Sequence, residues 1–155
     1  LAILMLIAAC GDDVTLAPDA QPIACAATFH GNFEELTRSP DRCARLDMHD
    51  GDWFAEVAIP ARAIDAPFTI ELDLGPTAGA VVSWSALATQ RIGNGACIYR
   101  AGSDATPRGA LDLTLDTIAL DTRTIHGSLD LTTYVLTSPG TDCGDGDTET
   151  LHVDF

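Results

Sequence analysis

A period-two alternation of apolar and polar residues constrains the fold of this chain more than any other feature. In the segments 53–59 and 68–74, every second residue is apolar, and Pro60 and Gly75-Pro76 follow directly. Successive side chains of a β-strand point to opposite faces, so this period predicts strands with one buried face and one wet face. A wet face is typical of antiparallel sheets.

Further short segments have the composition of strands, namely 27–30, 81–87, 96–100, 111–120, 125–136 and 151–155. The segment 81–87 alternates less clearly, which predicts a strand buried on both faces. In 111–120 the apolar parity shifts after Leu115, which predicts a β-bulge, because one extra residue restores the apolar face.

Turn and cap residues separate these segments. Ser39-Pro40-Asp41 has the order of a helix start, which predicts a brief helix over Pro40–Arg45. The carboxylate-rich stretch Asp47–Asp52 predicts a turn, as does Gly93-Asn94-Gly95.

These elements predict an all-β fold, an antiparallel β-sandwich or open barrel of about seven to nine strands with at most one short helix. Strands and helices do not alternate, which argues against a parallel nucleotide-binding sheet.

The first ten residues, LAILMLIAAC, are apolar and small up to Cys10, and Gly11-Asp12-Asp13 follow. This order resembles the lipobox of bacterial lipoproteins. The resemblance implies that Cys10 carries the lipid and that the chain is cleaved before it. Residues 1–9 would then be part of a signal peptide, 10–24 a flexible tether and 25–155 a single β domain.

The apolar stretch is too short to span a bilayer, which takes about 20 residues, so acyl chains would form the anchor. An ordinary secretory signal or a buried apolar N-terminus remains an alternative. Gly11, in place of the aspartate that retains enteric lipoproteins in the inner membrane, favours the outer membrane.

If Cys10 carries lipid, four cysteines remain, an even number in an exported chain. We favour bridges between Cys25 and Cys43 and between Cys97 and Cys143, among three alternative pairings. A zinc site is disfavoured, because no CxxC or HxxxH spacing occurs.

The charge is strongly acidic, with 23 acidic against 8 basic residues and a net charge of −15. Binding to nucleic acid is therefore disfavoured, since it depends on neutralising phosphates. All basic residues are Arg. Without Lys the chain can form neither a Schiff base nor a phosphate loop of the Walker type.

The C-terminal stretch from Asp142 to Glu149 concentrates four carboxylates among glycines: Asp142, Asp145, Asp147 and Glu149. Calcium takes six to eight oxygen ligands from flexible loops, so these residues are candidate calcium ligands. Their spacing departs from the EF-hand pattern, and a solvated hairpin tip is the favoured interpretation. We therefore expect no cofactor, with calcium at this loop as the alternative.

Three aromatic residues, Phe54, Trp84 and Tyr134, fall on or near the predicted polar faces, where rings can stack on sugars or anchor a partner. We therefore expect a non-catalytic envelope lipoprotein with a structural or interaction role, bound to the membrane through its lipid. One alternative is a carbohydrate- or calcium-dependent binding module, and another is a small periplasmic hydrolase. No catalytic residue is assigned.

Overall fold

The computed structural model describes residues 25–31, 35–39, 41–62, 64–137, 141–143 and 148–155. These residues form ten strands and no helix. The strands are β1 (Cys25–His30), β2 (Glu35–Ser39), β3 (Ala44–His49), β4 (Asp52–Ile59), β5 (Phe68–Gly75), β6 (Ser83–Ile92), β7 (Gly95–Gly102), β8 (Ala110–Ala119), β9 (Thr124–Thr137) and β10 (Thr148–Asp154). The prediction of an all-β, antiparallel fold is confirmed.

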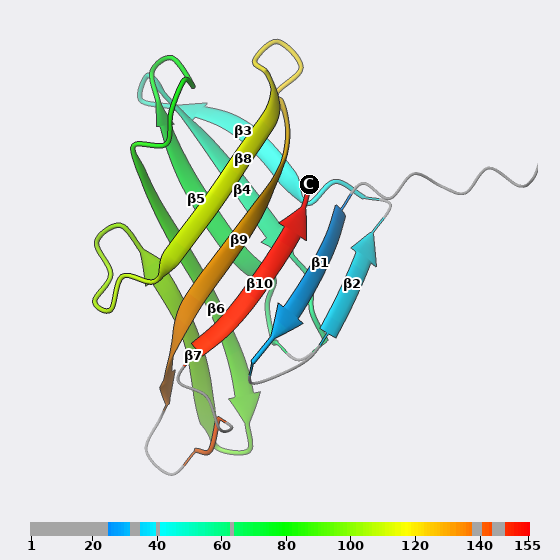
Figure 1. The fold of residues 1–155 in the computed structure, drawn as a ribbon, viewed down its shortest axis with the longest axis vertical. Helices are drawn as coiled ribbons and strands as arrows, with labels where there is room; N and C mark the ends of the chain where they lie inside the picture. Colours follow the sequence, from blue (N-terminus) through cyan, green and yellow to red (C-terminus); the bar gives the residue numbers. More distant parts are fainter. Residues whose placement is uncertain (1–24, 32–34, 40, 63, 138–140, 144–147) are drawn as a thin grey trace, which may run out of the picture.

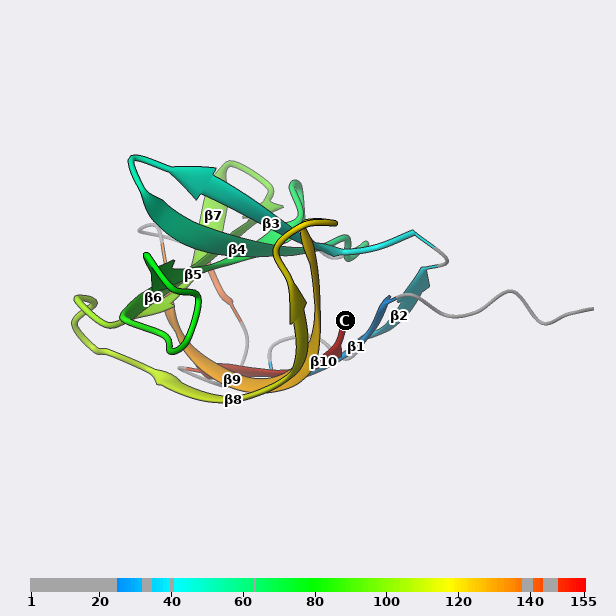
Figure 2. The same ribbon diagram turned by 90° about the horizontal axis from the view of Figure 1, so that it is seen from above.

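All strands belong to one sheet in the order β2-β1-β10-β9-β7-β6-β5-β4-β3, and β8 pairs with β9 beside β7 (Figure 1). The sheet curls into a half-barrel: β3 and β4 lie on one side of the interior and β8, β9 and β10 on the other (Figure 2). A single curled sheet takes the place of two separate stacked sheets.

The interior is filled by residues of alternate parity, as the sequence predicts. Trp53, Ala55, Val57 and Ile59 of β4 and Phe68, Ile70, Leu72 and Leu74 of β5 are all buried. At its centre the ring of Phe68 lies 5.9 Å from that of Phe29 and 6.5 Å from that of Tyr99, measured between centroids. Each such side chain stabilises the fold by about 1.5–3 kcal/mol when fully buried.

The edge strand β3 is tied to other parts of the fold by side chains. A disulfide joins Cys25, at the start of β1, to Cys43, just before β3. Arg123, in the β8–β9 turn, lies 3.1 Å from the Asp47 carboxylate of β3, and Arg42 donates a hydrogen bond of 3.2 Å to Thr124. The curl is thus held by one covalent link and by polar side-chain contacts.

The predicted helix over Pro40–Arg45 is wrong. Ala44 and Arg45 belong to β3, and the carbonyl of Cys43 accepts a 2.7 Å hydrogen bond from the Ala58 amide. The Ser39 hydroxyl does accept a hydrogen bond of 3.1 Å from the Asp41 amide, but the described residues that follow form no helix. Pairing with β4 and the disulfide at Cys43 therefore override the local capping signal.

The predicted turn over Asp47–Asp52 is too long, because Asp47 and His49 lie on β3. Only Asp50 and Gly51 connect β3 to β4, with φ of 52° and 95°. Two consecutive positive φ angles form the type I′ turn that suits a two-residue hairpin, and an Asp-Gly pair favours it.

The segment 81–87 is not buried on both faces. β6 begins at Ser83, and Leu87 is 54% exposed whereas its neighbour Ala86 is buried. The interior face of β6 carries alanines because large partners oppose them: Ala88 pairs with Tyr99, and Ala86 with Ile70.

Other predicted details agree with the structure. The register between β8 and β9 shifts between Leu115 and Thr117, which confirms the bulge. Gly93 and Asn94 form the turn between β6 and β7.

The sequence analysis missed β2 and β3, which bring the total number of strands above the predicted number. In β2 no residue is fully buried, so its apolar pattern is weak.

Candidate functional site

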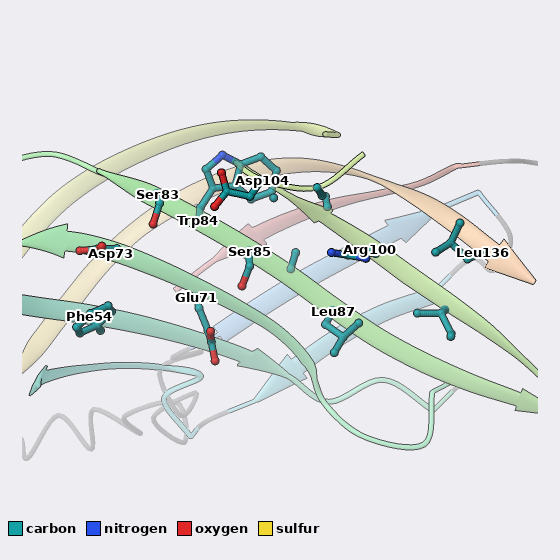
Figure 3. Close-up of a pocket in the computed structure, with 15 residues that line it drawn as sticks. Phe54, Glu71, Asp73, Ser83, Trp84, Ser85, Leu87, Arg100, Asp104 and Leu136 are labelled. Atoms are coloured by element: carbon teal, nitrogen blue, oxygen red, sulfur yellow. The ribbon is translucent and has the colours of Figure 1, made fainter. Parts of the chain in front are cut away.

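An open hollow of about 610 Å³ lies on the outer face of the sheet, over β4, β5, β6, β7 and β9 (Figure 3). We call it the outer groove and define it by Phe54, Glu71, Leu87, Ile98, Arg100 and Leu136. Phe54 lies toward one end of it and Leu136 toward the other (Figure 3). Because these residues come from five strands, the groove runs across the sheet rather than along one strand.

Strand parity explains why these side chains meet on the outside. Leu87 pairs with Arg100, which in turn pairs with Tyr134 on β9. Two residues along, on the same face, Ile98 pairs with Leu136. Residues paired directly across an antiparallel sheet share a face and have Cβ atoms about 5 Å apart. In these two neighbouring rows, Arg100 therefore has the aliphatic residues Leu87, Ile98 and Leu136 around it.

Two of the apolar residues of the groove are exposed to solvent. Leu87 is 54% and Leu136 45% exposed, whereas Ile98 is half-buried. Single exposed leucines need no explanation, but a contiguous apolar patch bordered by charges is typical of an interaction site.

Charges at the groove are incompletely paired. Glu71 on β5 lies directly opposite Glu56 on β4, and Arg45 neutralises only Glu56, at 3.0 Å. Neither Glu71 nor Arg100 forms an ion pair or side-chain hydrogen bond with a residue that the structure describes. Like charges directly opposite each other in a sheet are destabilising, so this edge of the groove would gain from a cation.

A smaller hollow of about 240 Å³ continues the groove toward the sheet edge. It shares Phe54 and Glu71 with the outer groove and adds Arg45, Asp47 and His49 of β3. Together the two hollows cross the sheet from β3 to β9.

Of the three aromatic residues predicted on polar faces, Phe54 and Trp84 both line the outer groove. Trp84 is also packed against the hydrophobic core, so only part of its ring is accessible. Tyr134 lies beside the groove, opposite Arg100. Sequence reasoning missed Leu87, Arg100 and Leu136, although Leu136 has the parity of the polar residue Tyr134.

A second outer surface, over β8, β9 and β10, carries the pair of His152 and Asp130. The Nδ1 atom of His152 lies 2.8 Å from the Asp130 carboxylate, and its Nε2 atom lies 3.5 Å from Asp154. The hydrogen bond to Asp130 is the main cause that raises the pKa of His152, with the charges of both aspartates adding to it. Both imidazole nitrogens thus face carboxylates, which favour the protonated form of His152.

Among the described residues, one carboxylate is fully buried in the interior, that of Glu149 on β10. Burial, followed by the charge of Glu149, raises the pKa of Tyr99 to about 12. The Tyr99 hydroxyl therefore stays protonated and donates a 2.7 Å hydrogen bond to Gln90. This hydrogen bond joins β7 to β6.

Among the candidate calcium ligands, Asp142 is exposed whereas Glu149 points into the interior. Glu149 has the parity of Leu151 and Val153, and that pattern could have predicted its burial. Asp145 and Asp147 lie outside the described residues. Within the described part of the chain, no group of three or more His, Cys, Asp or Glu side chains is arranged to hold a metal ion. Calcium binding by the loop stays a prediction.

The predicted cysteine pairing is confirmed, with disulfides between Cys25 and Cys43 and between Cys97 and Cys143. Cys10 lies outside the described residues. Among those that are described, no helix has the length and apolar character needed to cross a membrane.

Comparison of this chain with protein-family models, curated proteins and solved structures finds no match. The functional argument therefore depends on the sequence and on the surface just described.

Proposed function

We propose that this chain is a cell-envelope lipoprotein whose β domain has a non-catalytic, interaction role. Acyl chains on Cys10 form the membrane anchor, residues 10–24 connect it to the domain, and the outer membrane is the favoured location. The domain from Cys25 onward then presents its outer surface to a partner.

The observation that carries this proposal is the pairing of the cysteines. The other four cysteines pair with one another in two bridges, which leaves Cys10 as the odd one. Disulfides persist in oxidising compartments outside the cytoplasm, and export is what a lipobox-like leader would provide. An odd cysteine in an exported chain needs a separate use, and acylation is such a use.

The groove supports an interaction role over catalysis. It is open, crosses several strands and combines aliphatic side chains with unpaired charges. Catalytic carboxylates work at shifted pKa values in water-excluded clefts. Glu71, by contrast, is an exposed residue on the outer face of β5.

Intact mass spectrometry of the native protein tests the anchor. We expect a chain that begins at Cys10, carries acyl groups on it and is four hydrogens lighter than the fully reduced form. A Cys10→Ser variant is the matched control and should lose the acyl mass while it keeps both bridges. A native product that retains residues 1–9, or that carries free thiols at the four domain cysteines, would refute the proposal.

A further inference from the structure

We infer that the outer groove and the hollow beside it bind an extended, basic segment of a partner protein, with its apolar side chains on Leu87, Ile98 and Leu136. This inference rests on the interaction role proposed above, but not on the lipid anchor. Shape, apolar contacts and charge support it separately.

The shape suits a linear ligand. The two hollows cross the strands β3, β4, β5, β6, β7 and β9, which are neighbours in the sheet. With neighbouring strands about 4.8 Å apart, the five intervals span roughly 24 Å, the length of about seven residues of extended chain. A short extended segment thus fits the groove from end to end.

The apolar anchors lie at one end of that path. Leu87 and Leu136 come from strands on either side of β7, so a side chain that inserts between them also contacts Ile98. Aliphatic side chains bind aliphatic or aromatic side chains of a peptide by burying area, at about 25 cal/mol per Å². A saccharide would need flat rings on both sides, whereas Leu87, Ile98 and Leu136 are aliphatic.

The charges favour a basic partner. Over the two hollows the carboxylates Asp47, Glu56, Glu71, Asp73 and Asp104 outnumber the cations Arg45 and Arg100, in a chain of net charge −15. Such a field steers cationic segments toward the surface. A lysine or arginine placed over Glu71 would also relieve the repulsion between Glu71 and Glu56.

Arg100 supplies hydrogen-bond donors to the bound segment. Its guanidinium forms no ion pair in the described part of the chain, and the residue lies in the row between Leu87 and Tyr134. A guanidinium can donate several hydrogen bonds in one plane, and backbone carbonyls of an extended segment are suitable acceptors. The segment therefore places its apolar end at β6, β7 and β9 and its basic end toward Glu71.

The test uses the full chain and a synthetic, fluorescently labelled peptide with leucines at one end and lysines at the other, with binding followed by anisotropy. Glu71→Gln should weaken binding about 1.5- to fivefold, the range of a solvent-exposed ion pair. The double variant Leu87→Ser/Leu136→Ser should weaken it about tenfold or more, because two half-buried apolar contacts are lost.

Matched controls lie on other surfaces. Asp112→Asn removes an exposed carboxylate from β8, and Leu120→Ser removes an exposed leucine from the β8–β9 turn. Both should bind the peptide like the parent chain. Circular dichroism and thermal unfolding of every variant establish that the fold is retained.

Equal weakening by Glu71→Gln and Asp112→Asn would overturn the inference, since it would mean unspecific attraction to an acidic protein. Binding of a chitin-derived oligosaccharide in place of the peptide would overturn it in favour of a glycan site. Failure of peptide binding leaves the anchor untouched, because acylation of Cys10 is measured separately. An unacylated Cys10 likewise leaves the peptide result standing.

Discussion

Removal of either disulfide should destabilise the domain by a predictable amount. The two bridges close loops with sequence separations of 18 and 46 residues. The loop-closure relation gives about 3.2 kcal/mol at 25 °C for the shorter loop and about 4.0 kcal/mol for the longer one. We therefore expect Cys97→Ala/Cys143→Ala to cost more stability than Cys25→Ala/Cys43→Ala.

The shorter bridge should have a second, local effect. It links the start of β1 to the residue before β3, and β3 is a sheet edge with no backbone partner on its outer side among the described residues. Without this bridge, the curl depends on exposed contacts such as the one between Arg123 and Asp47. Amide exchange should then accelerate in β3 and its hairpin partner β4 before global unfolding.

Guanidinium denaturation of both double variants and of the reduced parent chain measures the loss, and hydrogen exchange locates it. Reduction of the parent should cost at least as much as the larger single loss. Unchanged denaturation midpoints, or faster exchange in β7 and β9 instead of β3 after removal of the Cys25–Cys43 bridge, would refute the reasoning.

Three further predictions concern other regions. Because the pKa of His152 is raised on folding, its stabilising effect is complete below the unfolded pKa of about 6.5 and disappears as the pH rises through the folded value. The stability difference between the parent and His152→Gln in urea should therefore shrink with rising pH, and a growing difference would contradict the assignment. Gly31→Ala should lower the free energy of unfolding by about 1–3 kcal/mol, because φ of Gly31 is +143° and a Cβ there would lie 2.7 Å from the Thr148 carbonyl oxygen. Gly51→Ala, with open space around the residue, should cost less in the same denaturation assay. Arg123→Gln should cost only about 0.2–1 kcal/mol, and that loss should vanish in high salt, because the ion pair with Asp47 is solvent-exposed; a salt-independent loss would mean that packing, and not charge, holds β3.

The faces of the long strands could be predicted because parity is a local property. Every second residue of β4 and β5 is buried, and the shift after Leu115 coincides with an actual bulge. The same rule would have placed Glu149 inside with Leu151, had the strand been extended by two residues. The stretch 142–149 has four carboxylates in eight residues, which favoured the interpretation of a loop instead.

Local rules failed where a distant strand supplied the decisive partner. The segment after Ser39 has the signals of a helix start, yet β4 pairs with it as β3. Leu87 sits outside because Tyr99 and Ile70, from the neighbouring strands, take the interior space beside β6. Neither outcome can be read from residues 39–45 or 81–87 alone.

The sequence by itself determined the all-β class, the buried faces of β4 and β5 and the acidic charge, since these depend on composition and on neighbours in the chain. The tertiary structure alone decided the strand order, and with it the outer groove. Phe54, Leu87, Arg100 and Leu136 are far apart in sequence and meet only because β4, β6, β7 and β9 lie in one curled sheet. Strand pairing is a long-range choice, which no local periodicity encodes.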